Sequence, residues 1–246
     1  MPGSVVVFSG MDGAGKSTQI ELLRQRFIDA GQNCTTFWSR GGYTPGINWI
    51  KSLMRRGSGN RLVPKAGPSS KRDQAFSRPM VRTLWLSLAI LDLMLLYGGW
   101  LRLKRLLGHH VICDRYLDDT RLDFAINFPQ ANVSKWLMWK LLEWVAIVPD
   151  RQFLLLIPVE ESLRRSKLKN EPFPDSPEVL ATRLEEYESW LADSSWHHVD
   201  GQRSLEEIAS EIASEIASEI ASEIASMVKI DDNPRSSTVR KAATTS

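Results

Sequence analysis

The stretch Val5-Val6-Val7-Phe8-Ser9-Gly10-Met11-Asp12-Gly13-Ala14-Gly15-Lys16-Ser17-Thr18 decides the fold of this chain. It begins with a short, continuous apolar run, which is typical of a strand buried on both faces of a sheet. A glycine-rich turn of the pattern G-x-x-x-x-G-K-[ST] follows, and apolar positions after Lys16 indicate a helix that ends at Gly31. Strand, loop and helix in this order predict a phosphate-binding loop within a βαβ unit.

The residue types of this loop suit the phosphates of a nucleotide. Glycines let the loop curl so that its N–H groups point at phosphate oxygens, and the helix that follows adds the positive end of its dipole. We expect the Lys16 ammonium to reach the β- and γ-phosphates and the Ser17 hydroxyl to join the shell of a hydrated Mg²⁺. An ordinary glycine turn is the alternative, which the strand before the loop and the helix after it disfavour. The predicted ATP-binding residues are Gly10, Met11, Asp12, Gly13, Ala14, Gly15, Lys16, Ser17 and Thr18.

Strand-like and helix-like segments alternate along the rest of the chain. Further strands are expected at residues 34–38, 111–113, 153–157 and 196–199. Helices are expected at 47–55, 77–106 with a bend near Gly98 and Gly99, 136–145, 159–169 and 178–191. This alternation predicts an α/β chain with the three-layer P-loop NTPase fold, in which helices cover both faces of a central, mostly parallel sheet.

The predicted domain covers residues 1–206 and includes a mobile basic loop at 56–74 and a lid at 165–177. The unit Glu-Ile-Ala-Ser then repeats five times over 207–226, and 227–246 reads as a disordered tail. Four residues advance an ideal helix by roughly 400°, so the isoleucine stripe drifts and only two or three repeats can pack on one core. A partner-binding helix is one interpretation of the array; extension of a terminal helix into solvent is the one we favour.

Composition narrows the partners and the compartment. Hydrophobic residues make up 43% and charged residues 24% of the chain, with a net charge of +2, so no strong field indicates nucleic acid or a membrane as partner. The two cysteines, Cys34 and Cys113, are expected to be reduced thiols. No signal peptide is recognisable, and the apolar stretch 84–101 carries Asp92, which favours a core helix over a membrane span. These features predict a cytoplasmic location.

Several motifs resemble those of thymidylate kinases, in order and spacing, over roughly residues 4–205 of the chain. The segment from Phe8 to Gln19 resembles the opening of that family, with an acid inside the loop and Gln after the Ser-Thr pair. Asp114-Arg115-Tyr116 at the end of an expected strand resembles the family's Asp-Arg-Tyr motif. Arg40 before Gly41-Gly42-Tyr43-Thr44-Pro45 resembles a weaker third motif, and 158–169 resembles the stretch from a strand into the lid.

The resemblance implies roles for individual residues. Asp12 would face the acceptor near its sugar, Arg115 would hold the acceptor phosphate, and Asp114 would orient Mg²⁺ or the attacking oxygen. Arg40 would be a second cation on the acceptor side. Some family members carry an arginine where this chain has Gly13, and those without it use a basic lid, a role that Arg165, Lys167 and Lys169 would fit. A solvated basic helix face is the alternative interpretation of these residues. The implied catalytic residues are Lys16, Asp12, Arg115 and Arg165; the acceptor-binding residues are Asp12, Arg40, Asp114 and Arg115; the metal-binding residues are Ser17 and Asp114.

The chain departs from the family on the acceptor side. The Gly-Gly turn lacks the Glu-Pro that precedes it in the family, and the middle helix has Asp92 without the arginine that usually follows. After Tyr116 the sequence is acidic, with Asp118, Asp119 and Asp123. These departures leave phosphoryl transfer in place and put the specificity for thymine in doubt.

Three functional hypotheses follow. The first is a nucleoside monophosphate kinase that uses ATP and Mg²⁺ with dTMP as acceptor to give ADP and dTDP, and the tryptophan-rich helices suit a homodimer. The second is a P-loop kinase with another small-molecule acceptor, in which the three aspartates bind sugar hydroxyls or act as a base. The third is a nucleotide-binding interaction protein without catalysis that uses the Glu-Ile-Ala-Ser helix. Intact Lys16, Ser17, Asp114 and Arg115 argue against the third hypothesis.

Overall fold

The computed structural model of the chain describes residues 2–38, 76–169 and 175–217. Its strands are β1 (Val5–Gly10), β2 (Cys34–Trp38), β3 (His110–Asp114), β4 (Arg151–Leu156) and β5 (Trp196–Asp200). Its α-helices are α1 (Lys16–Asp29), α4 (Pro79–Leu93), α5 (Leu101–Leu106), α6 (Leu117–Asn127), α7 (Leu137–Val145), α8 (Val159–Leu168) and α9 (Pro177–Trp190). A π-helix, Met94–Trp100, joins α4 to α5, and two short 3-10 turns, Pro129–Ala131 and Val133–Lys135, precede α7.

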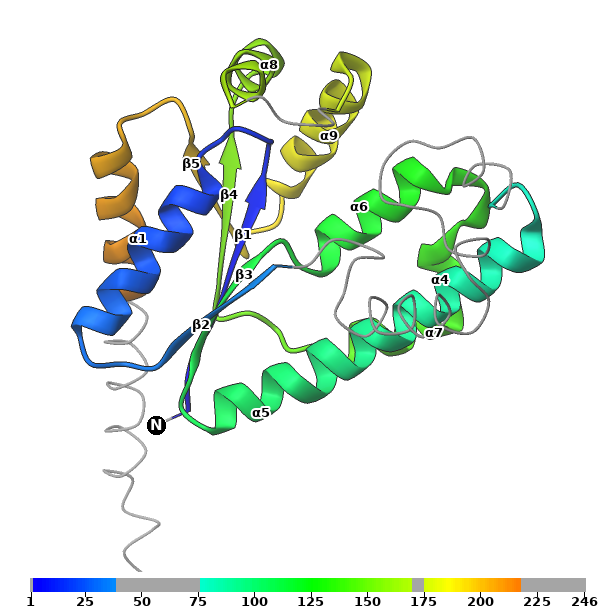
Figure 1. The fold of residues 1–246 in the computed structure, drawn as a ribbon, viewed down its shortest axis with the longest axis horizontal. Coiled ribbons are helices and arrows are strands. Elements are labelled where there is room, and N and C mark those ends of the chain that lie inside the picture. Colours follow the sequence, from blue (N-terminus) through cyan, green and yellow to red (C-terminus); the bar gives the residue numbers. More distant parts are fainter. Residues whose placement is uncertain (1, 39–75, 170–174, 218–246) are drawn as a thin grey trace, which may run out of the picture. The chain divides into compact units, whose positions relative to one another are not determined.

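The five strands form one sheet in the order β2-β3-β1-β4-β5, and every pairing is parallel. Helix α1 lies beside β1, β2 and β3, while α4, α5, α6 and α7 lie on the other side of the sheet (Figure 1). β1 is buried along its whole length, which explains its continuous apolar sequence. The predicted three-layer α/β fold is confirmed, and within the described residues the sheet is entirely parallel.

The strand register places the site. Phe8 of β1 pairs with Asp114 of β3, and Asp114 pairs in turn with Trp38 of β2. The carboxyl ends of three neighbouring strands therefore lie level with one another. In open parallel sheets this edge is where loops gather around a ligand.

The chain divides into two compact units, Met1–Arg203 and Ser204–Ser246. In the second unit the structure describes a helix over 205–217, in which Ile208, Ile212 and Ile216 are buried. These isoleucines belong to the first three Glu-Ile-Ala-Ser repeats. The interpretations of the later repeats and of the tail concern residues outside the described ones, as do the expected helix at 47–55 and the expected basic loop at 56–74.

The long helix differs from a regular α-helix at the expected place, since the π-helix Met94–Trp100 contains Gly98 and Gly99. By length and composition alone the helical stretch Pro79–Leu106 is apolar enough to cross a membrane, with a mean hydropathy of 1.7, and it is the one such helix among the described residues. One side of it is fully buried, at Leu86, Ala89, Ile90, Leu93, Tyr97 and Leu101. That side packs into the core as expected from the sequence, whereas Leu84, Leu91 and Leu95 on the rest of the helix are exposed.

Helix α6 is absent from the sequence prediction. Its amphipathic pattern is weak because aspartates occupy three of its buried or half-buried positions, Asp118, Asp119 and Asp123. Carboxylates at core-facing positions hide the helical period that apolar residues would show. Their partners, described below, explain why they are there.

Close backbone approach makes Gly10 essential at the end of β1. Its φ is +128°, and a Cβ there would lie 1.9 Å from the carbonyl oxygen of Leu155 in β4. Gly15 is a useful contrast, since its φ is +93° but a Cβ would meet no described atom within 4 Å. A side chain at Gly10 would therefore bring both backbone strain and a collision with β4, whereas a side chain at Gly15 would bring backbone strain alone.

We expect Gly10→Ala to lower the free energy of unfolding by at least about 3 kcal/mol and Gly15→Ala by only about 1–2 kcal/mol. Urea denaturation of both variants measures the difference. Equal losses in the two variants would show that β1 and β4 can separate at this point, contrary to the register described here.

Candidate active site

A polar pocket opens where the strand ends meet the glycine loop. Its lining residues are Asp12, Gly13, Gly15, Lys16, Ser17, Thr18, Trp38, Asp114, Arg115 and Lys169. They come from the loop after β1, from α1, and from the ends of β2, β3 and α8. Six of the nine residues predicted to bind ATP and three of the four predicted to bind the acceptor thus lie around one pocket.

The loop from Gly10 to Gly15 is shaped by three glycines with positive φ, at Gly10, Gly13 and Gly15. The last of these directly precedes the first residue of α1, so the free N–H groups of the helix begin at Lys16. This combination of a curled loop and a helix N-terminus is the arrangement that binds phosphate groups.

Lys16 is bound to its own loop. Its ammonium donates to the carbonyl oxygens of Gly10 at 2.9 Å and Met11 at 2.8 Å, and it lies 4.0 Å from the Asp12 carboxylate. Burial lowers the pKa of Lys16 to about 8, and the positive charge of Arg115 adds to the effect. An anion in the pocket would reverse this shift, because it would supply the negative charge that the ammonium lacks.

Asp114 has an unsatisfied carboxylate oxygen. Its Oδ1 is buried and finds no hydrogen-bond partner among the described residues, and burial raises the pKa of Asp114. The Ser17 hydroxyl lines the same pocket. One carboxylate and one hydroxyl suit Mg²⁺, which keeps several waters and takes further oxygens from substrate phosphates. No group of three or more His, Cys, Asp or Glu side chains that could hold a metal occurs within the described part of the chain.

Arg115 lies directly after Asp114 in an unusual backbone conformation. Its φ is +73°, its backbone N–H donates to the carbonyl oxygen of Phe8 at 2.8 Å, and the residue is 5% exposed. Its Nη2 donates to Asp12 at 2.5 Å, and its Nη1 donates to Asp119 at 3.3 Å and to Tyr187 at 2.9 Å. Burial alone would lower the pKa of Arg115, but Tyr187, Asp119 and Asp12 raise it well above the ordinary value.

Asp119 completes this cluster, and its pairing with Arg115 was not predicted from the sequence. It is 1% exposed and accepts hydrogen bonds from the Ser9 hydroxyl, the Tyr116 backbone N–H at 3.3 Å and the Tyr187 hydroxyl at 2.9 Å. The four-residue spacing from Arg115 was the available signal. It went unused because α6 itself was missed.

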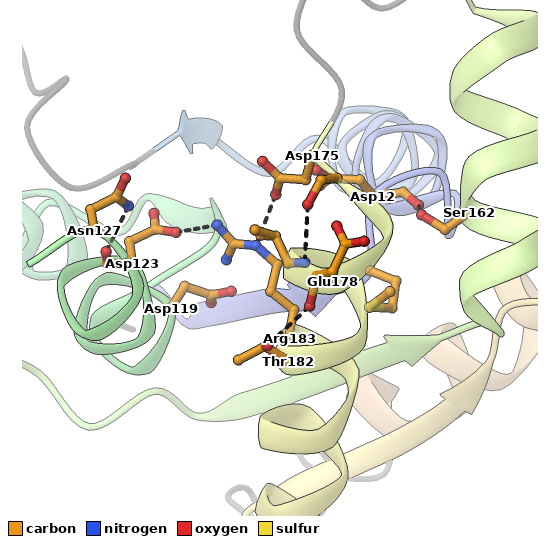
Figure 2. Close-up of polar contacts among 12 residues, drawn as sticks. Asp12, Asp119, Asp123, Asn127, Ser162, Asp175, Glu178, Thr182 and Arg183 are labelled. Carbon is orange, nitrogen blue, oxygen red and sulfur yellow. Dashed lines mark hydrogen bonds and ion pairs between the residues drawn. The ribbon is translucent and has the colours of Figure 1, made fainter. Parts of the chain in front are cut away.

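The other two aspartates of α6 are also paired with arginines. Asp118 lies 3.2 Å from Arg121. Asp123 lies 2.7 Å from Arg183 of α9, which is 2% exposed and also donates to Asp175 at 2.9 Å (Figure 2). Asp119 and Asp123 are held by buried arginines and are poor candidates for a general base, which favours an acceptor that is already ionised. Asp118 differs, because burial raises the pKa of its carboxyl despite the nearby Arg121.

Arg165 contacts the loop from α8. Its Nη1 donates to the carbonyl oxygens of Gly13 at 3.0 Å and Gly201 at 3.1 Å, and its Nε donates to Glu161 at 2.5 Å. From the same helix, the Ser162 hydroxyl donates to the Asp12 carbonyl at 2.7 Å (Figure 2). α8 therefore holds the backbone of the loop. Lys169, at the end of α8, lines the pocket, and Arg165 is absent from its lining.

Two predicted features lie outside the described residues. Arg40 is one, and the part of the predicted lid at 170–174 is the other. The expected state of the cysteines agrees with their surroundings: both are free thiols, and burial raises the pKa of Cys34 to about 11 and that of Cys113 further.

Comparison with known proteins returns relatives with one name. The chain is 28% identical over 172 residues to a thymidylate kinase from Bartonella henselae, and the aligned region covers 70% of this chain and 71% of the relative. It is 33% identical over 170 residues to a thymidylate kinase from Rhodopseudomonas palustris, covering 68% and 64%, and 26% identical over 218 residues to one from Ruegeria pomeroyi, covering 85% and 92%. The chain thus spans slightly less than two thirds of the Rhodopseudomonas relative. No protein-family model matches the chain.

The lowered pKa of Lys16 predicts how nucleotide binding depends on pH. Phosphate groups need the charged ammonium, and above about pH 8 the free protein holds it neutral. We therefore expect the affinity for ATP to fall roughly tenfold between about pH 7 and about pH 9, with proton uptake on binding above about pH 8.

Isothermal titration at each pH, in two buffers of different ionisation enthalpy, measures both quantities. Lys16→Arg is the matched control, because a guanidinium stays charged over this range. A wild-type affinity that is flat with pH, without proton uptake, would contradict the assignment of Lys16 to the phosphates.

Proposed function

We propose that the chain is a nucleoside monophosphate kinase, with thymidylate kinase as its specific activity: it transfers the γ-phosphoryl group of ATP to dTMP and gives ADP and dTDP. The observation that carries the proposal is the pairing of two buried cations on one pocket. Lys16 belongs to a loop built for phosphates, and Arg115 lies at the end of the neighbouring strand, joined to that loop through Asp12. The names of the relatives support dTMP as the acceptor.

On the donor side, the loop N–H groups and Lys16 bind the β- and γ-phosphates. Phosphate oxygens then replace the carbonyl oxygens of Gly10 and Met11 as hydrogen-bond acceptors of the Lys16 ammonium. Ser17 and Asp114 hold Mg²⁺. An ion held by these two residues would supply positive charge to offset the charge that develops on the transferred phosphoryl group. The Oδ1 of Asp114 supports this role, since it is buried without a hydrogen-bond partner among the described residues and Asp114 lines the pocket.

On the acceptor side, the phosphate of the monophosphate replaces the Asp12 carboxylate on the Nη2 end of Arg115. A planar guanidinium presents two parallel N–H groups, which match two phosphate oxygens. Asp12 is then released to accept a hydrogen bond from the sugar. The acceptor oxygen is already ionised at neutral pH, so the residues need only position it and offset charge.

We also propose a homodimer and a cytoplasmic location. The outer faces of α4 and α7, which are neighbours in Figure 1, expose large apolar side chains: Met80, Leu84, Leu91, Leu137, Leu141 and Trp144. A second copy of the chain would cover them. The absence of nucleic-acid and membrane partners stays a prediction from composition.

A panel of acceptors tests the function. Coupled ADP release is measured with dTMP, other nucleoside monophosphates and free sugars, and we expect dTMP to exceed the others at least roughly tenfold in kcat/KM. Lys16→Ala should abolish turnover while the melting temperature is retained, since the ammonium acts on the transferred group. Turnover with a sugar alone would support the second hypothesis, and ATP binding without turnover of any acceptor would support the interaction protein.

Arg165 is the proposed source of positive charge at the transferred group, in place of the arginine that some thymidylate kinases carry at the position of Gly13. We expect Arg165→Ala to lower kcat at least roughly a hundredfold, either by removing that charge or by releasing the Gly13 carbonyl that it holds.

The matched control is Arg164→Ala on the same helix, where the arginine side chain is 62% exposed and also pairs with Glu161. It should leave kcat within about twofold. Equal kcat values for the two variants would place Arg165 outside the catalytic machinery.

A further inference from the structure

Three elements hold the guanidinium of Arg115. Asp12 of the glycine loop binds Nη2, and Asp119 of α6 and Tyr187 of α9 bind Nη1. A guanidinium nitrogen of this type carries two hydrogens. Nη1 therefore has an acceptor for each of its hydrogens, whereas Nη2 donates to Asp12 alone among the described residues.

Helices α6 and α9 are joined by two polar pairs one turn apart. Tyr187 meets Asp119, with 2.9 Å between the hydroxyl and the carboxylate, and Arg183 meets Asp123 at 2.7 Å. Residues four apart on a helix lie on the same side of it, so both pairs join the same side of α6 to the same side of α9. Figure 2 shows Arg183 of α9 directed at Asp123 with Asp119 nearby. The first pair ends on Arg115.

We propose that Asp119 and Tyr187 are positioning residues that fix Nη1 of Arg115, so that its Nη2 end is presented to the acceptor phosphate; this rests on the proposed function. The fixed end lets the guanidinium exchange Asp12 for a phosphate without turning. Tyr187 is suited to the task because its hydroxyl donates to Asp119 and so presents its lone pairs to Arg115. The negative charge of Asp119 stabilises the guanidinium of Arg115, a residue whose backbone φ is +73°.

A purely structural role for the same residues has different consequences. Asp119 also accepts from the backbone N–H of Tyr116 at the start of α6, as a helix cap does. Tyr187 is 0% exposed and packs edge-on against Trp190, with 4.8 Å between ring centroids. Loss of a helix cap or of packing lowers the stability of the fold, but it does not weaken the binding of the acceptor more than the binding of ATP.

The first test is Tyr187→Phe, which keeps the ring and removes the hydroxyl. We expect the KM for dTMP to rise roughly tenfold or more and the KM for ATP to stay within about twofold. The matched control is Thr120→Val. It removes another buried hydroxyl of this region, one that bonds to the Tyr116 carbonyl at 3.0 Å and does not touch Arg115. The control should leave the ratio of the two KM values unchanged. An equal ratio in Tyr187→Phe and Thr120→Val overturns the proposal.

The second test does not need turnover. Side-chain ¹⁵N–¹H resonances of Arg115, assigned with Arg115→Lys, report rotation of the guanidinium. We expect separate, slowly exchanging Nη resonances in the wild-type protein and in Thr120→Val, and averaged resonances in Tyr187→Phe and Asp119→Asn. Averaged resonances in the wild type, or separate ones in both variants, overturn the proposal. A wild-type protein that phosphorylates no monophosphate but shows the expected resonances contradicts the proposed function and leaves the positioning role intact.

Discussion

The active-site end of the sheet depends on the burial of one guanidinium, that of Arg115. A buried charge is costly unless carboxylates and hydrogen bonds surround it. Its backbone N–H donates to the Phe8 carbonyl oxygen of β1, and its φ is in the left-handed region. Its side chain collects Asp12, Asp119 and Tyr187 from three different elements. The hydrogen bonds that compensate this one buried charge thus join α6 and α9 to the glycine loop.

The donor and acceptor sides are held in contrasting ways. On the donor side the backbone is fixed: glycines curl the loop, and Ser162 and Arg165 of α8 hold its carbonyls. The charged atoms remain exchangeable there, since Lys16 rests on carbonyl oxygens that phosphates can replace. On the acceptor side one end of Arg115 is fixed and the other is bound by Asp12, whose side chain is 27% exposed. Under the proposed function, a group of the protein occupies in both places the position that a phosphate would take, which compensates the charge of the cations in the free protein.

The sequence predicted the elements that carry a strong local signal. β1, the glycine loop and α1 were recognisable because a buried strand, three glycines with positive φ and a helix N-terminus are all encoded within a few residues. Arg115 and Asp114 were recognisable from their place at a strand end. Asp119, Tyr187 and Arg183 were missed as a cluster because they are 4 to 72 residues distant from their partners in sequence. Buried aspartates also removed the apolar pattern that would have revealed α6. A polar cluster assembled by tertiary packing leaves no periodic trace in the chain.

The central claim is that the two cations of this pocket bring two phosphates together for transfer. The most direct measurement is ³¹P nuclear magnetic resonance of the products formed from ATP and dTMP with Mg²⁺ present. The structure predicts that the γ-phosphate signal of ATP decays while the β-phosphate doublet of dTDP grows at the same rate, and that Arg115→Lys slows both. Release of inorganic phosphate with no new diphosphate would show that the acceptor side does not receive a phosphate, and would contradict the account.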